Sequence, residues 1–230
     1  VLNVLQAIDT DELIGDEEQA KHALLLSMAL DKNFVDKTDF EVLQPAIDYY
    51  DDNGSATDKL RTYYYQGRIY QNAGNDAAAM EAFVKAISEG NESNDILTKA
   101  RTYFAQSHIY YSLYEWDNFI ETNKNSALLF KESGMINSYA NCLNRIINGY
   151  TLKEEPNSAL PYIYECKTLL QDMSISRLTE FYASYLTYLT NFGTEQEMNE
   201  ILQEYISAVP SSMIDRLTIA NAYLKMNNYN

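Results

Sequence analysis

The chain has 230 residues, a formal net charge of −16 at pH 7, 20 tyrosines, four prolines and eight glycines. So few helix-breaking residues favour long helices over hairpins. The negative charge argues against nucleic acid and anionic membrane surfaces as partners, because both are bound through clustered Lys and Arg. No apolar run approaches the roughly 20 residues of a membrane-spanning helix. The chain begins at Val1 rather than Met, so we expect a processed N-terminus from which a targeting segment was removed.

The first part of the chain, residues 1–53, is predicted to form an irregular helical hairpin. A short helix is expected at 2–8, followed by helices at 17–30 and about 41–51. Asp51-Asp52-Asn53-Gly54 has the composition of a calcium loop. However, Tyr49 stands at the place of the first ligand, and no Glu follows at the right distance. We therefore interpret this segment as the turn that ends a helix.

A ten-residue segment then recurs after 40 positions. Residues 61–70 read Arg-Thr-Tyr-Tyr-Tyr-Gln-Gly-Arg-Ile-Tyr, and residues 101–110 read Arg-Thr-Tyr-Phe-Ala-Gln-Ser-His-Ile-Tyr, with six of ten identical. Tyr150 occupies the place of Tyr70 and Tyr110 a further 40 residues on. A fixed period of this length indicates a repeat architecture, in which each unit buries its apolar face by stacking on its neighbours.

The spacing within one unit predicts a pair of helices. Tyr63, Gly67 and Tyr70 lie on one stripe of a helix, and Ala79 and Phe83 begin the stripe of a second. The segment 74–76, Gly-Asn-Asp, supplies the end of the first helix and the N-cap of the next. The small residues at 67 and 79 allow the two helices to approach closely.

The same register divides the rest of the chain. The predicted repeat units are about 56–92, 93–133, 134–173 and 174–209, with an incomplete unit at 210–230. Helices are expected at 134–152, 157–171, 175–191, 194–208 and 211–226, with Asn227, Asn228 and Tyr229 as the final turn. Because a solenoid normally ends with a complete polar cap, we expect these residues to be part of a longer protein.

The pattern Tyr63-x2-Gln66-Gly67-x2-Tyr70, followed by Ala79-x3-Phe83 and Ala86, resembles the tetratricopeptide (TPR) signature. The pattern departs from that signature, with Tyr63 for the usual Trp, Gln66 for the usual Leu, no helix-ending Pro, and a period of 40 rather than the usual 34. The resemblance implies an all-α fold, with one TPR-like domain over residues 1–230. That domain would be a right-handed α-solenoid of antiparallel helix pairs with a period of about 40 residues.

Two early segments are similar to bacterial TPR proteins that sit outside the cytoplasmic membrane. They are residues 16–32 and the Pro-Ala-Ile-Asp-Tyr-Tyr segment at 45–50. Many such proteins are lipid-anchored, or form the sensory half of a membrane-spanning regulator. The resemblance implies an extracytoplasmic location in a bacterium, periplasmic or lipid-anchored. A cytoplasmic location stays open as the alternative.

Residues suited to catalysis or metal binding are sparse. His22 and His108 lie in different units, and neither is in a ligand spacing. Cys142 and Cys166 have no neighbouring His and do not supply the four ligands of a zinc site. We interpret both cysteines as buried core residues, with a disulfide between paired helices as the alternative. Nucleotide-binding and nucleophile motifs are missing, so we predict a protein that is not an enzyme and needs no cofactor or metal.

In TPR solenoids the first helix of each unit lines a concave groove. The resemblance therefore assigns partner binding to residues one turn around from the packing stripe: Arg61, Tyr64, Arg68, Gln71, Arg101, Phe104, His108, Tyr111, Asn141, Asn144 and Asn148. Three of the chain's six arginines fall on this face, and no carboxylate does. Arginine pairs with carboxylates, aromatic rings give flat contacts, and Asn bonds an extended backbone. We predict that the face binds an acidic or C-terminal peptide segment. The alternative is that Arg61 and Arg101 pair with acidic residues of neighbouring units.

Three functions follow from these observations. The favoured one is a protein–protein interaction scaffold that holds a protein or peptide partner in the groove, without binding nucleic acid or inserting into a membrane. The second is the sensory domain of a membrane-bound transcriptional or signalling regulator. The third is a carbohydrate-binding lipoprotein of nutrient uptake, which would need a platform of exposed aromatic residues and is disfavoured by the single Trp.

Overall fold

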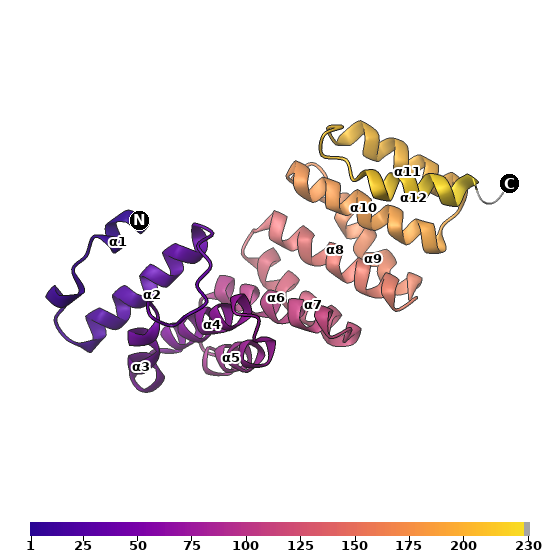
Figure 1. Ribbon diagram of the computed structural model, residues 1–230. Helices are drawn as coiled ribbons and strands as arrows, with labels where there is room; N and C mark the ends of the chain where they lie inside the picture. The colour runs from indigo at the N-terminus through magenta and orange to yellow at the C-terminus, as the bar shows by residue number, and fades with distance from the viewer. Residues whose placement is uncertain (228–230) are drawn as a thin grey trace. The chain divides into compact units, whose positions relative to one another are not determined.

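The computed structural model describes residues 1–227, and every regular element within them is helical (Figure 1). The all-α prediction is therefore confirmed. The chain divides into two compact units: the first comprises residues 1–109, and the second begins at Tyr110. Among the described residues, no helix combines the length and the apolarity that crossing a membrane requires. The single repeat domain expected over residues 1–230 stays a prediction.

The first unit contains five helices and the beginning of a sixth. They are α1 (Leu2–Gln6), α2 (Asp16–Lys32), α3 (Gln44–Asn53), α4 (Ala56–Asn72), α5 (Asp76–Glu89) and α6 (Ile96–Ser112), with a short 3-10 turn at Thr10–Glu12. From α1 to α5, each helix packs against the next one in sequence. Their core includes Leu24, Leu43, Tyr65, Phe83 and, from α6, Ile109.

The second unit takes up the end of α6 and six further helices. They are α7 (Trp116–Glu132), α8 (Ile136–Leu152), α9 (Pro156–Thr168), α10 (Ile175–Phe192), α11 (Glu195–Ala208) and α12 (Arg216–Asn227). Helix α8 packs against α7, α9 and α10, and α10 packs against α11 and α12. The first helices of successive pairs, α8, α10 and α12, are therefore neighbours in one row (Figure 1). Fully buried side chains such as Ile146, Ile163 and Phe181 fill the core.

The 40-residue repeat is visible in the backbone. Helices α2, α4, α6 and α8 each have 17 residues and begin 40 positions apart, at residues 16, 56, 96 and 136. The turns that follow have a positive φ at Phe34, Gly74, Tyr114 and Glu154. After each of these four residues, the next N–H donates to the carbonyl five positions back, at 2.9 or 3.0 Å. This is the hydrogen bond of a Schellman helix end. The 40-residue spacing of the first helices is confirmed and extends to α2, one helix further towards the N-terminus than the sequence indicated; α3 begins at Gln44, 32 positions before α5 at Asp76, and does not follow it.

The close approach predicted for α4 and α5 is confirmed at Gly67. A Cβ atom placed on Gly67 would lie 2.4 Å from Cε1 of Phe83. Phe83 is fully buried, and so is Ala79, one turn earlier on α5. Asn75 caps α5 by accepting a hydrogen bond from the N–H of Ala78, as the sequence predicted for this turn.

Three helix boundaries differ from the predictions by three residues or more, and the first is the start of α3, at Gln44 instead of about 41. Helix α12 begins at Arg216 instead of 211, because Asp215 accepts hydrogen bonds from the Leu217 N–H at 3.0 Å and from the Thr218 hydroxyl at 2.7 Å. Helix α9 ends at Thr168 instead of 171. The helix end predicted at residues 51–54 is confirmed, since α3 stops at 53. Of the final turn predicted at 227–229, residues 228 and 229 lie outside the described residues.

Both cysteines are buried and free, which confirms their interpretation as core residues. The Cys142 thiol donates a weak hydrogen bond to the Ser126 hydroxyl at 3.4 Å, and Cys166 lies 3.8 Å from Oδ1 of Asn144. Burial raises the pKa of Cys142 to about 11 and raises that of Cys166 as well. The two side chains therefore remain protonated at neutral pH.

Candidate functional site

The predicted face of α4 carries arginines that are already paired within the first unit. Nε of Arg61 donates to Oδ2 of Asp95 at 2.6 Å, and Nε of Arg68 lies 3.6 Å from Oδ1 of Asp31. The prediction of a face without carboxylates is therefore wrong. The acidic residues come from neighbouring repeats, which stacking brings beside the arginines. The alternative that Arg61 pairs within the protein is confirmed, whereas no ion pair of Arg101 is found in residues 1–227.

The carboxylate of Asp95 is held as an anion by several donors. Burial raises its pKa, but hydrogen bonds from the backbone N–H of Thr98, from Arg61 and from the Thr98 hydroxyl outweigh that effect and lower it. The same Thr98 bonds place Asp95 at the start of α6. Because the guanidinium of Arg61 is already paired with this carboxylate, Arg61 is poorly suited to bind an anionic group of a partner.

The aromatic residues predicted for this face have different environments. Tyr64 is only 5% exposed and packs in the core against Tyr65 and Phe83, so its assignment to a binding groove is wrong. Burial raises the pKa of Tyr64 to about 12. Phe104 is half-buried and His108 is exposed, with their ring centroids 4.9 Å apart. The fourth residue of this face, Gln71, is half-buried and accepts a hydrogen bond from Arg68.

The remaining predicted residues lie in the second unit, and two of them line a groove there. Tyr111, which is 49% exposed, and Asn148 both contribute to a groove with a volume of about 910 Å³. Asn141 is half-buried and is not among the lining residues. Asn144 is buried, which removes it from any surface that a partner could contact directly.

We call this depression the polar groove. Its lining comes from the ends of α6 and α7 and from α8, α10 and α12. The residues are Tyr111, Phe119, Arg145, Asn148, Thr151, Leu152, Glu154, Ala183, Ser184, Thr187, Asn191, Phe192, Asp215 and Thr218. Beside three aromatic rings, two carboxylates and one guanidinium, six of the fourteen lining residues carry an amide or an aliphatic hydroxyl group. Such groups donate and accept hydrogen bonds without carrying charge.

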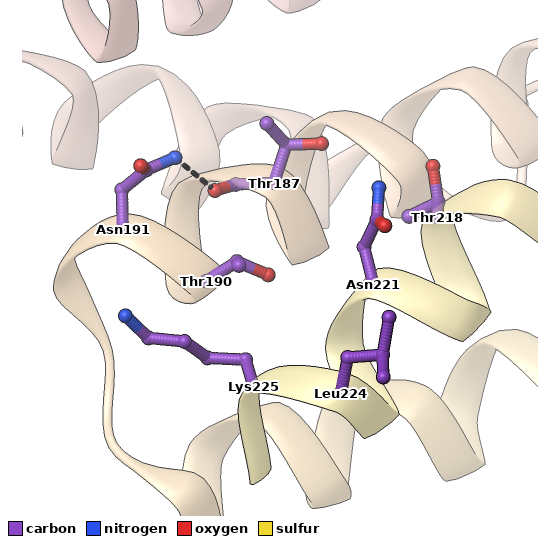
Figure 2. Close-up of a pocket in the computed structure, with 7 residues that line it drawn as sticks. All are labelled: Thr187, Thr190, Asn191, Thr218, Asn221, Leu224 and Lys225. Carbon is purple, nitrogen blue, oxygen red and sulfur yellow. Dashed lines mark hydrogen bonds between the residues drawn. The ribbon is translucent and has the colours of Figure 1, made fainter. Parts of the chain in front are cut away.

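A smaller pocket of about 410 Å³ adjoins the polar groove and shares Thr187, Asn191 and Thr218 with it. Figure 2 shows Thr187, Thr190 and Asn191 of α10 on one side and Asn221 of α12 on the other. The Asn191 amide donates to the Thr187 carbonyl at 2.8 Å, which holds it along its own helix. Leu224 and the positively charged Lys225, both on α12, complete the lining of the smaller pocket. Polar side chains thus continue from α8 across α10 to α12.

Arg145 is one of the twelve lining residues that the sequence prediction did not include. Its Nε donates to Oδ1 of the fully buried Asn123 at 3.1 Å, and its guanidinium lies 4.9 Å from the centre of the Phe119 ring. The Asn123 amide in turn donates to the Phe119 carbonyl at 2.7 Å. Burial lowers the pKa of Arg145 to about 10. A single cation inside the otherwise uncharged run of residues 139–152 was the signal available in the sequence.

The arrangement is suited to binding. The lining contains neither His nor Cys, and within residues 1–227 no group of three or more His, Cys, Asp and Glu side chains is placed to hold a metal ion. Asp215 uses its carboxylate to begin α12, and Glu154 lies exposed at the rim. The groove therefore offers hydrogen bonds, aromatic surface and one partly desolvated guanidinium.

Neither a protein-family model nor a curated protein matches the chain.

Proposed function

We propose that the protein is an interaction scaffold that holds an extended polypeptide segment of a partner in the polar groove. The observation that carries the proposal is the continuous polar lining over α8, α10 and α12. An extended segment repeats an N–H and a C=O at every residue, and Asn amides satisfy both kinds of group. Ser184, Thr187 and Asn191 follow one another along one face of α10, so they form a row of such partners.

The sequence resemblance supports the same proposal. In a TPR-like solenoid the first helices of successive pairs line the binding surface, and α8, α10 and α12 are first helices in the predicted register. Placement outside the cytoplasmic membrane of a bacterium is part of the proposal and rests on the resemblance alone. The aromatic rings of Tyr111, Phe119 and Phe192 give the groove the flat contact area typical of strong protein interaction sites.

The test is a selection of random displayed peptides on the purified protein, followed by fluorescence anisotropy of the recovered peptides. Thr187 is exposed in the groove, so Thr187→Trp fills it without disturbing the core. Ser176→Trp is the matched control, because Ser176 is exposed on the same helix and does not line the groove. We expect Thr187→Trp to weaken binding at least tenfold and Ser176→Trp to leave it unchanged. Equal binding by both variants would place the peptide elsewhere.

A second candidate function is carbohydrate binding, which one observation favours. Trp116 is half-buried at the start of α7, and the rings of Tyr111 and Tyr114 each lie 5.6 Å from it, centroid to centroid. Tyr114 is 76% exposed. This cluster supports the second candidate, because a sugar-binding site needs exposed aromatic rings. A glycan array distinguishes the two functions: glycan binding that Trp116→Ala abolishes, without groove-dependent peptide binding, would favour the carbohydrate.

A further inference from the structure

The smaller pocket between α10 and α12 is lined by hydroxyl groups whose protons are already used. The hydroxyl of Thr187 donates to the Ala183 carbonyl at 2.9 Å, and the hydroxyl of Thr190 donates to the Leu186 carbonyl at 2.8 Å. A carbonyl oxygen has no hydrogen to give, so in each pair the proton lies on the bond to the helix backbone. Each of these hydroxyls therefore offers the pocket the lone pairs of its oxygen.

The hydroxyl that lines the pocket from α12 is in the same state. Thr218 donates to Oδ2 of Asp215 at 2.7 Å, and that carboxylate lines the polar groove but not the smaller pocket. Figure 2 shows the hydroxyl oxygens of Thr187 and Thr190 on the side of α10 that is nearer to Asn221. A group that enters between the two helices thus meets hydroxyl oxygens that act as acceptors.

Two amide side chains add groups of both kinds to the lining. Asn191 uses one amide hydrogen on the Thr187 carbonyl, at 2.8 Å, which leaves its oxygen and its second hydrogen for other partners. No side-chain hydrogen bond of Asn221 is found in residues 1–227. The pocket therefore combines several acceptors with a small number of N–H donors.

The charges of the lining disfavour ionised side chains as ligands. The pocket is lined by no carboxylate, and Lys225, its one ionisable residue, is basic. An ammonium or guanidinium that entered would lose water without meeting a counter-ion in this lining, which is unfavourable. A carboxylate has no hydrogen to donate, so it cannot bond to hydroxyl oxygens whose protons point to the backbone. The ligand that fits is neutral and supplies N–H groups.

We propose that the smaller pocket binds the side-chain carboxamide of a Gln or Asn residue in the segment that the polar groove holds. A primary amide has two N–H donors for the hydroxyl oxygens and one carbonyl acceptor for an amide N–H of Asn191 or Asn221. The inference rests on the proposed function, because it assigns the chemistry of one position of that segment.

The position and size of the pocket suit a single side chain. Thr187, Asn191 and Thr218 line both the pocket and the polar groove, so a segment in the groove passes the mouth of the pocket. The volume of about 410 Å³ lies within the range of about 300–1,000 Å³ that small-molecule sites have. A whole Gln side chain therefore has room to enter from the groove.

The first measurement uses the recovered displayed peptides whose binding Thr187→Trp weakens. Each Gln is replaced by Glu and by Met, and each Asn by Asp and by Leu, and all forms are measured on the wild-type protein. We expect one position at which both replacements weaken binding about tenfold, the effect of two lost neutral hydrogen bonds. The apolar form keeps the backbone N–H groups of the peptide, so its weaker binding assigns the donors to the side chain. Equal binding of all forms, tighter binding of the acid, or peptides without Asn and Gln would overturn the proposal.

Variants of the protein locate this position in the smaller pocket. Thr190 and Asn221 line the smaller pocket but not the polar groove. Thr190→Val keeps the shape of the side chain and removes its oxygen, so the preference for the amide over the apolar form should fall at least threefold. Asn221→Asp supplies the carboxylate that the lining lacks, so a peptide with Lys at this position should gain at least threefold relative to Gln. An unchanged amide preference in both variants would place the carboxamide elsewhere and refute the inference.

Thr179→Val is the matched control. Thr179 is half-buried on the same helix, donates to the Ile175 carbonyl at 2.9 Å as Thr190 does to its own helix, and lines neither the pocket nor the groove. We expect this variant to keep the amide preference of the wild type. A loss equal to that of Thr190→Val would show that the effect arises from the helix and not from the pocket.

The two proposals fail in distinguishable ways. If no recovered peptide is sensitive to Thr187→Trp, the proposed function fails, and the inference fails with it. If peptides bind in the groove but the amide, acid and apolar forms bind equally, the function stands and the inference alone is refuted. The peptide replacements are measured on wild-type protein, so this outcome does not depend on the folding of any variant.

Discussion

Replacing Gly67 with Ala tests the packing of the repeat most directly. On helix propensity alone, Gly→Ala inside a helix stabilises by about 1 kcal/mol. At this position the new Cβ would lie 2.4 Å from Cε1 and 2.5 Å from Cδ1 of Phe83, well inside contact distance. Phe83 is fully buried, so its ring has little room to move. Overpacking of a close-packed core costs about 1–3 kcal/mol and occasionally more. The clash outweighs the propensity, and we expect a net loss of about 1 kcal/mol, from the middle of the overpacking range less the gain in propensity.

Urea unfolding followed by far-UV circular dichroism measures the change in the unfolding free energy. Because repeat proteins need not unfold in one step, native-state hydrogen exchange of α4 and α5 amides should accompany it. A double-mutant cycle with Phe83→Leu identifies the cause. If the ring contact is responsible, Phe83→Leu costs less in the Gly67→Ala background than in wild type. A Gly67→Ala variant more stable than wild type would refute the reasoning, because it would show that the helices separate without cost.

Three further predictions concern the stability and reactivity of single residues. Phe34 is 93% exposed and has a φ of 58°, a conformation that costs a non-glycine residue about 1–2 kcal/mol. Glycine avoids this cost but loses more backbone entropy on folding, so Phe34→Gly should raise the urea midpoint by the equivalent of several tenths of a kcal/mol. A lower midpoint would show that the Phe34 ring contributes to stability. Asp95→Asn should cost about 1 kcal/mol at pH 7 by weakening the bond to Arg61. Hydrogen bonds outweigh burial and lower the pKa of Asp95 in the folded protein. The stabilisation by its carboxylate is therefore fully present above the pKa of about 3.9 of an unfolded Asp, and it is lost as the pH falls through the lower folded-state pKa. The difference in unfolding free energy between wild type and variant should shrink below about pH 4, and an unchanged difference in acid would contradict the ionic origin. Cys142 and Cys166 are buried, and burial raises the pKa of both thiols, so a thiol reagent should label them only after unfolding; rapid labelling of the native protein would show that the helix pair opens.

The helices and their 40-residue repeat could be predicted from the sequence, because the signals that specify them are local. The stripe through Tyr63, Gly67 and Tyr70 indicates a helix whatever surrounds it, and Asn75 caps the next helix through a hydrogen bond within its own turn. Such signals act over three or four residues. They therefore predicted most helix boundaries closely, and they failed at the start of α12, where the cap residue Asp215 was not recognised.

Only the tertiary structure decided which side chains are available to a partner. Tyr64 lies beside the packing stripe of α4, yet it is buried because α4 is covered on more than one face, including by residues of α6. Arg61 finds Asp95 at a distance of 34 positions in the sequence. Arg145 reaches the polar groove from inside an uncharged run, where Asn123 and Phe119 hold it. A helical pattern specifies the direction in which a side chain points from its own helix. Whether that direction leads to solvent, to a counter-ion or into a groove depends on how neighbouring helices pack against it.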